Sequence, residues 1–267
     1  MEITNSGKLV LVTGGSGFIA VHCILKLLQR GYNVRATLRS LSRADEVKSM
    51  LRVGGLTQFE NLSFIEADLS DDKNWNEAVR DCDFVLHVAS PTPVIKYTSE
   101  DEFIRPARDG VLRVLKAARD ANVKRVVLTS AFGAIGMGHK SRVTPYTEKD
   151  WTNIEADIHP YQKSKTVAER AAWDFINKEG GNLELSTVNP VGVMGPVLGV
   201  DYSHSNQSIR QMLEGEIPAC PKISSCYIDV RDVADLHLLA MTHIKARVKG
   251  SWQPPVRRCR CWMLQKS

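Results

Sequence analysis

The 267-residue sequence lacks the marks of several classes of protein. No apolar run approaches the ~20 residues that a membrane-spanning helix needs, and the segment Met1–Lys8 lacks the basic and then apolar pattern of a secretion signal. Six cysteines in so long a chain do not make a disulfide framework. Only Cys259 and Cys261 lie close together, and no second pair completes a zinc site. We therefore expect a cytoplasmic protein with no membrane span and no bound metal.

Acidic residues are absent from residues 245–267, which hold seven of the 35 Lys and Arg residues. The rest of the chain, residues 1–244, carries 30 acidic and 28 basic side chains, a net charge of −2. The overall charge of +5 therefore belongs to a tail and not to a folded face. Because nucleic-acid binding requires a basic stripe on a folded surface, this distribution argues against a DNA or RNA partner.

The remaining composition is that of a globular protein, with 43% hydrophobic and 24% charged residues. Short apolar runs, typical of buried strands, alternate with longer segments of helical periodicity. A parallel sheet covered by helices on both faces produces this alternation. We therefore predict an α/β fold, a Rossmann-type doubly wound parallel sheet. The expected strands are 8–13, 33–38, 62–66, 83–88, 123–130 and 183–189, and the expected helices are 18–29, 42–52, 73–79, 100–121 and 161–179.

The strand–helix rhythm weakens after residue 190, where Gly and Pro crowd between Pro190 and Gly199. We expect one large domain over residues 1–190 and a second, smaller lobe over residues 191–244. Residues 245–267 form the basic tail, and its last part, residues 251–267, shows neither helical nor strand periodicity.

A glycine-rich segment joins the first expected strand to the first expected helix. Residues 13–19 read Thr-Gly-Gly-Ser-Gly-Phe-Ile. Gly14 permits a tight turn, Gly17 lets the backbone approach a pyrophosphate, and the free N–H groups of the helix start receive its charge. Because strand, loop and helix occur together at the start of a βαβ unit, the segment predicts dinucleotide binding.

The end of the second strand indicates which dinucleotide binds. An acid at this place bonds the ribose of NAD, whereas an arginine accommodates the 2′-phosphate of NADP. The sequence has Arg39 there, with Arg43 close behind and no acid before Asp45. An arginine can hold the phosphate with two hydrogen bonds, so NADP(H) is the predicted cofactor. Asp68 follows the third strand, where it can reach the adenine or cap a helix.

Two residues with acid–base chemistry open the expected helix 161–179. Tyr161 and Lys165 are four residues apart, so their side chains lie on one helix face. A tyrosine with an unperturbed pKa near ~10 exchanges protons poorly at neutral pH. A neighbouring ammonium favours the phenolate, so the pair makes a workable acid and base.

The ordered set of motifs resembles one family. Thr-Gly-Gly-Ser-Gly-Phe-Ile (13–19) is followed by Ala-Asp-Leu (67–69), His-Val-Ala-Ser-Pro (87–91) and Thr-Ser-Ala-Phe-Gly-Ala (129–134), and then by Tyr161-x-x-x-Lys165, Asn-Pro-Val-Gly-Val-Met-Gly-Pro (189–196) and Tyr-Ile-Asp-Val-Arg-Asp-Val-Ala (227–234). Over residues 8–244 the chain is similar to the extended short-chain dehydrogenase/reductases, in the branch of dihydroflavonol-4-reductase and related aldehyde and ketone reductases.

The resemblance implies an NADP-dependent carbonyl reductase or alcohol dehydrogenase, a monomer or homodimer acting on a small carbonyl substrate. It implies that Tyr161 protonates the substrate oxygen and that Lys165 holds the nicotinamide ribose and lowers the pKa of the tyrosine. A serine at the end of the fifth strand would bond the carbonyl oxygen. The implied cofactor-binding residues are Thr13, Gly14, Gly15, Ser16, Gly17, Phe18, Ile19, Arg39, Asp68, Leu69, Val88, Ala89, Ser90, Tyr161, Lys165, Pro190, Val191 and Val193.

The serine position departs from the family pattern. Relatives commonly carry two hydroxyl residues there, and the second is the catalytic one. In the direct alignment this second position is Ala131, which leaves Ser130 one place earlier. One residue of shift at a strand end can point a side chain the opposite way. Ser130 is the expected catalytic serine, with Thr129 as the reserve.

The C-terminus is the second departure, because the resemblance stops near residues 249–250. Shifting the reading frame by two bases over residues 250–256 permits Phe-Leu-Ala-Thr-Ser-Gly, which resembles the strand expected next in this branch. We hypothesise that a frameshift replaced the C-terminal part with the tail. An intact in-frame segment 251–267 in close relatives would contradict this hypothesis.

Two other functions stay open on the same fold. In a nucleotide-sugar epimerase or dehydratase, Tyr161 and Lys165 would serve a transient oxidation with NAD, and Arg39 argues against this cofactor. In a non-catalytic NADP-binding sensor, Ala131 and the altered tail would be tolerated. A sensor has no need of the Tyr161–Lys165 pair.

Overall fold

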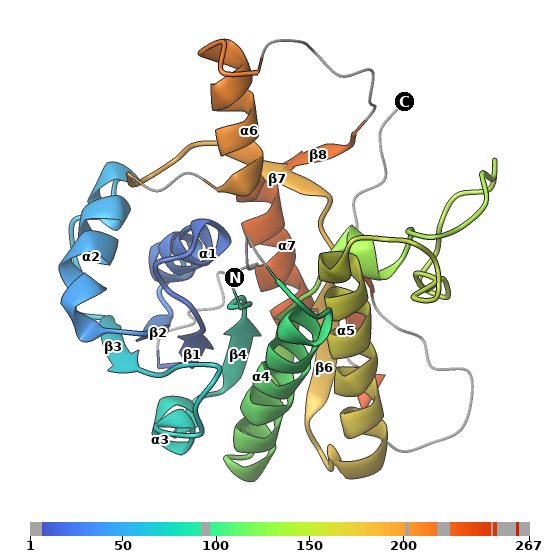
Figure 1. The fold of residues 1–267 in the computed structure, drawn as a ribbon. Coiled ribbons are helices and arrows are strands. Elements are labelled where there is room, and N and C mark those ends of the chain that lie inside the picture. Colours follow the sequence, from blue (N-terminus) through green and yellow to red (C-terminus); the bar gives the residue numbers. More distant parts are fainter. Residues whose placement is uncertain are drawn as a thin grey trace.

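The computed structural model describes residues 7–91, 97–200, 203–217, 225–246, 248–249 and 260–261, with only the backbone described at 204, 248–249 and 260–261. Its main sheet contains parallel strands in the order β10-β6-β5-β4-β1-β2-β3, with β9 added to β6 (Figure 1). The strands of this sheet are β1 (Leu9–Val12), β2 (Asn33–Leu38), β3 (Leu62–Glu66), β4 (Phe84–His87), β5 (Arg125–Thr129), β6 (Glu184–Val188), β9 (Val248–Lys249) and β10 (Arg260–Cys261). The predicted Rossmann-type sheet is confirmed.

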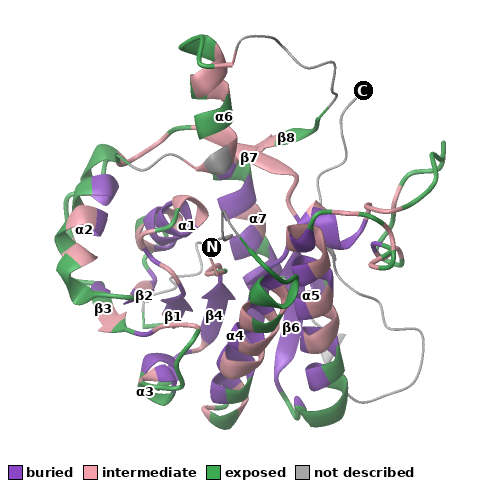
Figure 2. Ribbon diagram, in the orientation of Figure 1, coloured by how far each residue is buried: buried purple, intermediate pink, exposed green. Residues whose placement is uncertain are grey.

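Helices cover both faces of the sheet, as the alternating sequence pattern predicts (Figure 1). The first face carries α1 (Phe18–Gln29), α2 (Ala44–Val53) and α7 (Val230–Thr242), and the second carries α3 (Trp75–Val79), α4 (Asp101–Asp120) and α5 (Pro160–Glu179). The strands between them are largely buried (Figure 2). This explains why their sequences read as continuous apolar runs rather than as alternating ones.

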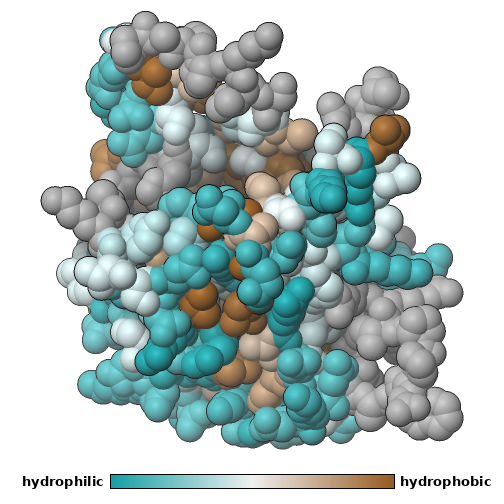
Figure 3. Space-filling view, turned by 45° about the vertical axis from the view of Figure 1, so that its right-hand side comes forward, coloured by the Kyte–Doolittle hydropathy of each residue, from teal (hydrophilic) through white to brown (hydrophobic). Residues whose placement is uncertain are grey.

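A smaller unit follows the main strands. β7 (Gly192–Met194) and β8 (Tyr227–Asp229) form a two-stranded parallel sheet, and α6 (His204–Leu213) stands beside it (Figure 1). Three short 3-10 turns complete the described elements: η1 (Leu41–Arg43), η2 (Phe132–Ala134) and η3 (Ile244–Ala246). The face shown in Figure 3 is mainly hydrophilic, with apolar residues in small separate areas.

The placement of α7 differs from the expected division at residue 190. This helix falls in the range 191–244, yet its buried residues Ala234 and Leu238 belong to the same core as α1 and the sheet. Arg125, at the start of β5, is 2% exposed and donates to Glu184 Oε2 at 2.7 and 2.9 Å. Its Nη1 also donates to carbonyl oxygens at residues 240, 241 and 243. The sheet domain therefore includes α7, because the buried face of this helix packs in the core that α1 and the strands form.

The tail also differs from the expectation that it forms no strand. β9 runs antiparallel to β6 at Glu184 and Leu185, and β10 runs parallel to it at Thr187 and Val188. The exposed edge of a sheet offers unpaired N–H and C=O groups to any extended segment, whatever its side-chain pattern. The other residues concerned in the frameshift hypothesis, 251–259 and 262–267, lie outside the described residues.

Candidate active site

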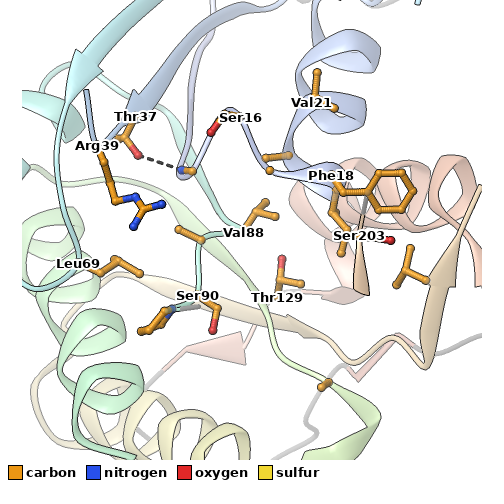
Figure 4. Close-up of a pocket in the computed structure, with 18 of the residues that line it drawn as sticks. Ser16, Phe18, Val21, Thr37, Arg39, Leu69, Val88, Ser90, Thr129 and Ser203 are labelled. Carbon is orange, nitrogen blue, oxygen red and sulfur yellow. Dashed lines mark hydrogen bonds between the residues drawn. The ribbon is translucent and has the colours of Figure 1, made fainter. Parts of the chain in front are cut away.

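A pocket of about 830 Å³ lies at the carboxyl ends of the parallel strands. Figure 4 shows Arg39 and Leu69 on one side of it and Phe18 and Ser203 on the other, with Thr129 between them. The pocket wall includes most of the expected cofactor residues: Gly14, Ser16, Gly17, Phe18, Ile19, Arg39, Asp68, Leu69, Val88, Ala89, Ser90, Tyr161, Lys165, Pro190, Val191 and Val193.

The glycine-rich loop is seated tightly against its neighbours. Gly14 has φ +67°, and a Cβ there would lie 3.0 Å from the Cβ of Ala89. The N–H of Gly14 donates to Thr37 Oγ1 at 3.0 Å, the bond drawn in Figure 4. After this loop α1 begins with no side-chain cap and no acidic residue in its first turn. The start of α1 therefore leaves N–H groups for an anion in the pocket.

Thr13 and Gly15, both expected to bind the cofactor, are not part of the pocket wall. Thr13 is fully buried; its Oγ1 accepts from Ala89 N–H and lies 2.9 Å from His87 Nδ1. Gly15 donates to the carbonyl of Thr37 at 2.8 Å. Both residues therefore hold the loop in place by hydrogen bonds to neighbouring segments, Thr13 through its side chain and Gly15 through its backbone N–H.

Positive charge gathers at the end of the pocket nearest β2. Arg39 and Arg43 both belong to the wall. Arg43 donates to Ser16 Oγ at 2.9 Å and to the carboxylate of Glu46 at 2.7 and 2.8 Å, so it joins the glycine-rich loop to α2. Asp68 accepts from the N–H and hydroxyl of Ser70, and these bonds lower the pKa of its carboxyl. Asp68 thus shapes a turn and also lines the pocket.

Tyr161 and Lys165 lie at the opposite end, in the first turns of α5. The helix begins at Pro160, and the His159 side chain caps it by accepting from the Tyr161 N–H at 3.2 Å. Lys165 is 8% exposed, and its Nζ lies 5.8 Å from the centre of the Tyr161 ring. The one-turn spacing therefore brings both groups to the same pocket, as the sequence predicts.

The hydroxyl groups after β5 have different partners. Thr129 Oγ1 lies 2.7 Å from His237 Nε2, and His237 Nδ1 lies 2.7 Å from the carbonyl of Val233. Burial lowers the pKa of His237 to about 4, so the ring is neutral at physiological pH. Because a carbonyl can only accept, Nδ1 carries the proton and Nε2 accepts the Thr129 hydroxyl. Thr129 therefore has no proton to donate to a substrate.

Ser130 remains available. Its Oγ is buried without a hydrogen-bond partner among the described residues, and the residue lines the main pocket and a cavity of about 10 Å³ beside Lys165 and Glu169. A buried hydroxyl without a partner is costly, so a bound group that accepts its proton would be stabilised there. Ala131, the next residue, also lines the pocket.

Other pocket residues carry no recognisable motif. Sequence reasoning noted Arg43 only as close behind Arg39, and it quoted Ala67 and Pro91 only as parts of family motifs. It missed the others because apolar and small residues are uninformative singly. The further wall residues are Ala20, Val21, Thr37, Met50, Ala67, Ser70, Trp75, Pro91, Pro106, Val197, Leu198, Gly199, Ser203 and Ser205.

The wall fits a long, anionic, two-ended ligand. Arginines lie at one end, an uncapped helix start and close-approach glycines lie in the middle, and Tyr161 with Lys165 lies at the other end. Among the residues that the structure describes, no cluster of three or more His, Cys, Asp or Glu could hold a metal ion. Over the same ranges, no helix has the length and apolarity to cross a membrane.

Comparison with known proteins agrees with this geometry. The chain is 34% identical to a cinnamoyl-CoA reductase of Medicago truncatula, over 92% of this chain and 76% of that one. It is 34% identical to a dihydroflavonol 4-reductase of Zea mays, over 78% of this chain and 59% of that one. The crystal structure of Gre2 from Candida albicans in complex with NADPH superposes with a TM-score of 0.75 and 30% identity, covering 91% of this chain and 77% of that one.

The family described as NAD dependent epimerase/dehydratase matches residues 10–252. This range contains the glycine-rich loop, every residue of the pocket wall and the strands from β2 to β9. The chain therefore belongs to this family, the extended short-chain dehydrogenase/reductases.

Proposed function

We propose that this chain is an NADP-dependent oxidoreductase that reduces an aldehyde or ketone to an alcohol. The observation that carries the proposal is the single pocket that joins two arginines at one end to the Tyr161–Lys165 pair at the other. The relatives named above support it, since two are reductases by name and the third was crystallised with NADPH.

The residues that would hold NADP(H) follow from the wall. Arg39 and Arg43 would hold the 2′-phosphate with charge-assisted bonds, and the start of α1 would receive the pyrophosphate. Asp68 and Leu69 would contact the adenine. Val88, Ala89 and Ser90 would line the pocket along the length of the cofactor. Pro190, Val191 and Val193 would line the nicotinamide. When bound, this cofactor supplies the hydride.

The protein's own groups manage the substrate oxygen. Tyr161 would donate its phenolic proton to that oxygen as negative charge develops on it. Lys165 would hold the nicotinamide ribose, and its ammonium would favour the phenolate that Tyr161 becomes. Ser130 would donate a second hydrogen bond, because its hydroxyl has no partner in the part of the chain that the structure describes and that of Thr129 is bound to His237. Tyr161 and Ser130 would thus both donate hydrogen bonds to the substrate oxygen on which negative charge develops.

The alternatives are weaker on the same geometry. An NAD-dependent nucleotide-sugar epimerase has no use for two arginines at the end of β2. A non-catalytic NADP-binding sensor is favoured by Ala131, which puts a methyl group where relatives carry a hydroxyl. The Tyr161–Lys165 pair opposes that function.

The testing experiment is a fluorescence titration with NADPH and with NADH, followed by turnover with a panel of aryl aldehydes, aliphatic aldehydes and ketones. We expect tighter binding of NADPH and oxidation of NADPH in the presence of a carbonyl. Binding without any turnover would favour the sensor, and tighter binding of NADH would overturn the cofactor assignment.

Two coarser expectations accompany the proposal. A cytoplasmic location rests on cysteine usage, since Cys23 and Cys82 are buried free thiols. Burial raises the pKa of the Cys82 thiol to about 11, which makes it unreactive. A monomer or homodimer is expected, and light scattering of the purified chain decides between them.

A further inference from the structure

Glu169 is a fully buried acid that the proposed chemistry leaves without a role. It lies on α5, one turn after Lys165 and two turns after Tyr161, so the three side chains follow one face of the helix. Its exposure is 0%, and it lines the small cavity beside Ser130. A carboxylate in such a place is tolerated only when donors surround it.

Donors that reach Glu169 include side chains from two parts of the molecule, α5 itself and the end of β6. Asn189 Nδ2 donates to Oε2 at 2.7 Å, and Trp173 Nε1 donates to Oε1 at 3.3 Å. The Trp173 bond stays within α5, whereas the Asn189 bond joins α5 to the end of β6. Asn189 immediately precedes Pro190 and Val191, which line the pocket.

The Asn189 amide also reaches a third segment. Its Nδ2 donates to the carbonyl of Ala131 at 3.2 Å, next to Ser130. The N–H of Phe132 donates in turn to the carbonyl of Pro190 at 2.8 Å. One buried carboxylate therefore ties together the helix with the acid–base pair, the segment after β5, and the loop that lines the far end of the pocket.

We propose that Glu169 is a positioning residue that holds the wall segment 189–193 and the Ala131 backbone in register with Tyr161 and Lys165. The inference rests on the proposed reductase function. Hydride transfer depends on sub-ångström placement of the reacting groups, whereas binding of the adenine and phosphates takes place at the other end of the pocket. Glu169 thus acts on the hydride step and not on affinity for NADPH.

The test compares two changes at this carboxylate. Glu169→Leu keeps the bulk but removes both acceptors. In the double variant Glu169→Gln with Trp173→Phe, the single amide oxygen can face Asn189 because the competing indole N–H is gone. The control is Glu184→Gln, which alters another buried acid at the opposite end of β6, bound to Arg125 and remote from the pocket.

For Glu169→Leu we expect kcat to fall about tenfold or more, with a larger primary isotope effect from NADPH deuterated at its transferring position. The NADPH dissociation constant should stay within about twofold of wild type. The fluorescence emission of bound NADPH should move toward that of free NADPH, a readout independent of turnover. The double variant should show the wild-type isotope effect again. Glu184→Gln should show the wild-type isotope effect as well, although we expect both variants to have lower thermal stability than the wild type.

A wild-type isotope effect and emission in folded Glu169→Leu would overturn the proposal, as would an equal change in Glu184→Gln. Should Glu169→Leu not fold, Asn189→Ala removes the same bond from the strand side and carries the same expectations. If wild-type protein turns over no carbonyl, the reductase proposal fails separately, and the emission of bound NADPH still decides the role of Glu169.

Discussion

The two ends of the pocket are built differently. At the end proposed to hold the phosphates (the phosphate end), Gly14 and Gly17 present their backbone, and Arg39 and Arg43 come from the neighbouring strand end and turn. At the end proposed for the reaction (the reacting end), the groups are mostly buried and arrive from β5, α5, β6 and α7. The first end depends on short local segments and the second on the assembled fold. Affinity for the cofactor and chemistry on the substrate should therefore be separable by substitution.

Tyr161→Phe should separate them most sharply. The variant loses the phenolic proton donor, and we expect kcat to fall about 10²- to 10⁴-fold. NADPH affinity should fall far less, because the ring of residue 161 and the phosphate end both stay in place. Steady-state kinetics and a fluorescence titration measure both quantities. Tyr146→Phe is the matched control, since Tyr146 packs on Phe132 and His139 away from the pocket. Substantial turnover by Tyr161→Phe would contradict the assigned role.

Low pH should destabilise the protein through buried histidines, one of which lies at the reacting end. His237 is buried and neutral, with its pKa lowered to about 4 from 6.5 by desolvation. Because the unfolded chain takes up this proton below pH 6.5 and the native chain does not, stability is full above pH 6.5 and falls between pH 6.5 and 4. The loss from this residue is about 3 kcal/mol. Burial, with the charge of Lys165, lowers the pKa of His87 to about 3, which adds to the same trend.

Urea unfolding at a series of pH values between 7 and 4 measures this dependence. His237→Gln can keep both hydrogen bonds and should flatten the curve, whereas His139→Gln, in a partly exposed loop, should not. An unchanged slope in His237→Gln would show that its burial does not control acid stability.

Arg39→Ala should act at the phosphate end alone. Loss of a charge-assisted contact to the 2′-phosphate should weaken NADPH binding about ten- to hundredfold and leave NADH binding unchanged. Fluorescence titrations with the two cofactors give the ratio. Arg105→Ala is the control, because Arg105 pairs with Asp101 on α4 outside the pocket wall. Equal losses for both cofactors would refute a phosphate-specific role.

Gly14→Ala should have the smallest effect. Its φ of +67° and the 3.0 Å approach to Ala89 mean that a methyl group would displace the loop, which we expect to weaken NADPH binding about tenfold and to cost about 1–2 kcal/mol of stability. Gly31→Ala has a similar φ of +76° and open space around the added carbon. It should lose stability without losing affinity. If both variants bind NADPH equally well, the loop does not approach the cofactor closely.

The local parts of this structure could be predicted from sequence, and the assembled parts could not. α1 occupies Phe18–Gln29 and β2 occupies Asn33–Leu38, as periodicity indicates, since each pattern reflects burial of that segment alone. The pairing of Tyr161 with Lys165 follows from helix geometry in the same way. By contrast, Thr129 meets His237 across 108 positions. No periodic pattern states which distant helix will supply a partner.

The serine question shows the same limit. Sequence alone left Thr129 and Ser130 both open, because a strand end can turn either side chain toward the pocket. The choice between the two hydroxyls depends on His237 of α7, because the Thr129 hydroxyl donates its proton to this histidine. Likewise, α7 has an apolar face in its sequence, but only the folded chain shows that this face completes the core of the sheet.

The hydrogen bonds of Arg125 limit how early this protein can complete its folding during synthesis. A ribosome releases β5 and β6 long before α7, yet the guanidinium buried between those strands takes three of its acceptors from residues 240, 241 and 243. Until that stretch emerges, Arg125 lacks these three acceptors, and the apolar face of the sheet that α7 covers is open to water. A chain stopped at residue 190 should therefore be recognised by chaperones and proteases as unfinished, and maturation should be a late, single event at the end of synthesis.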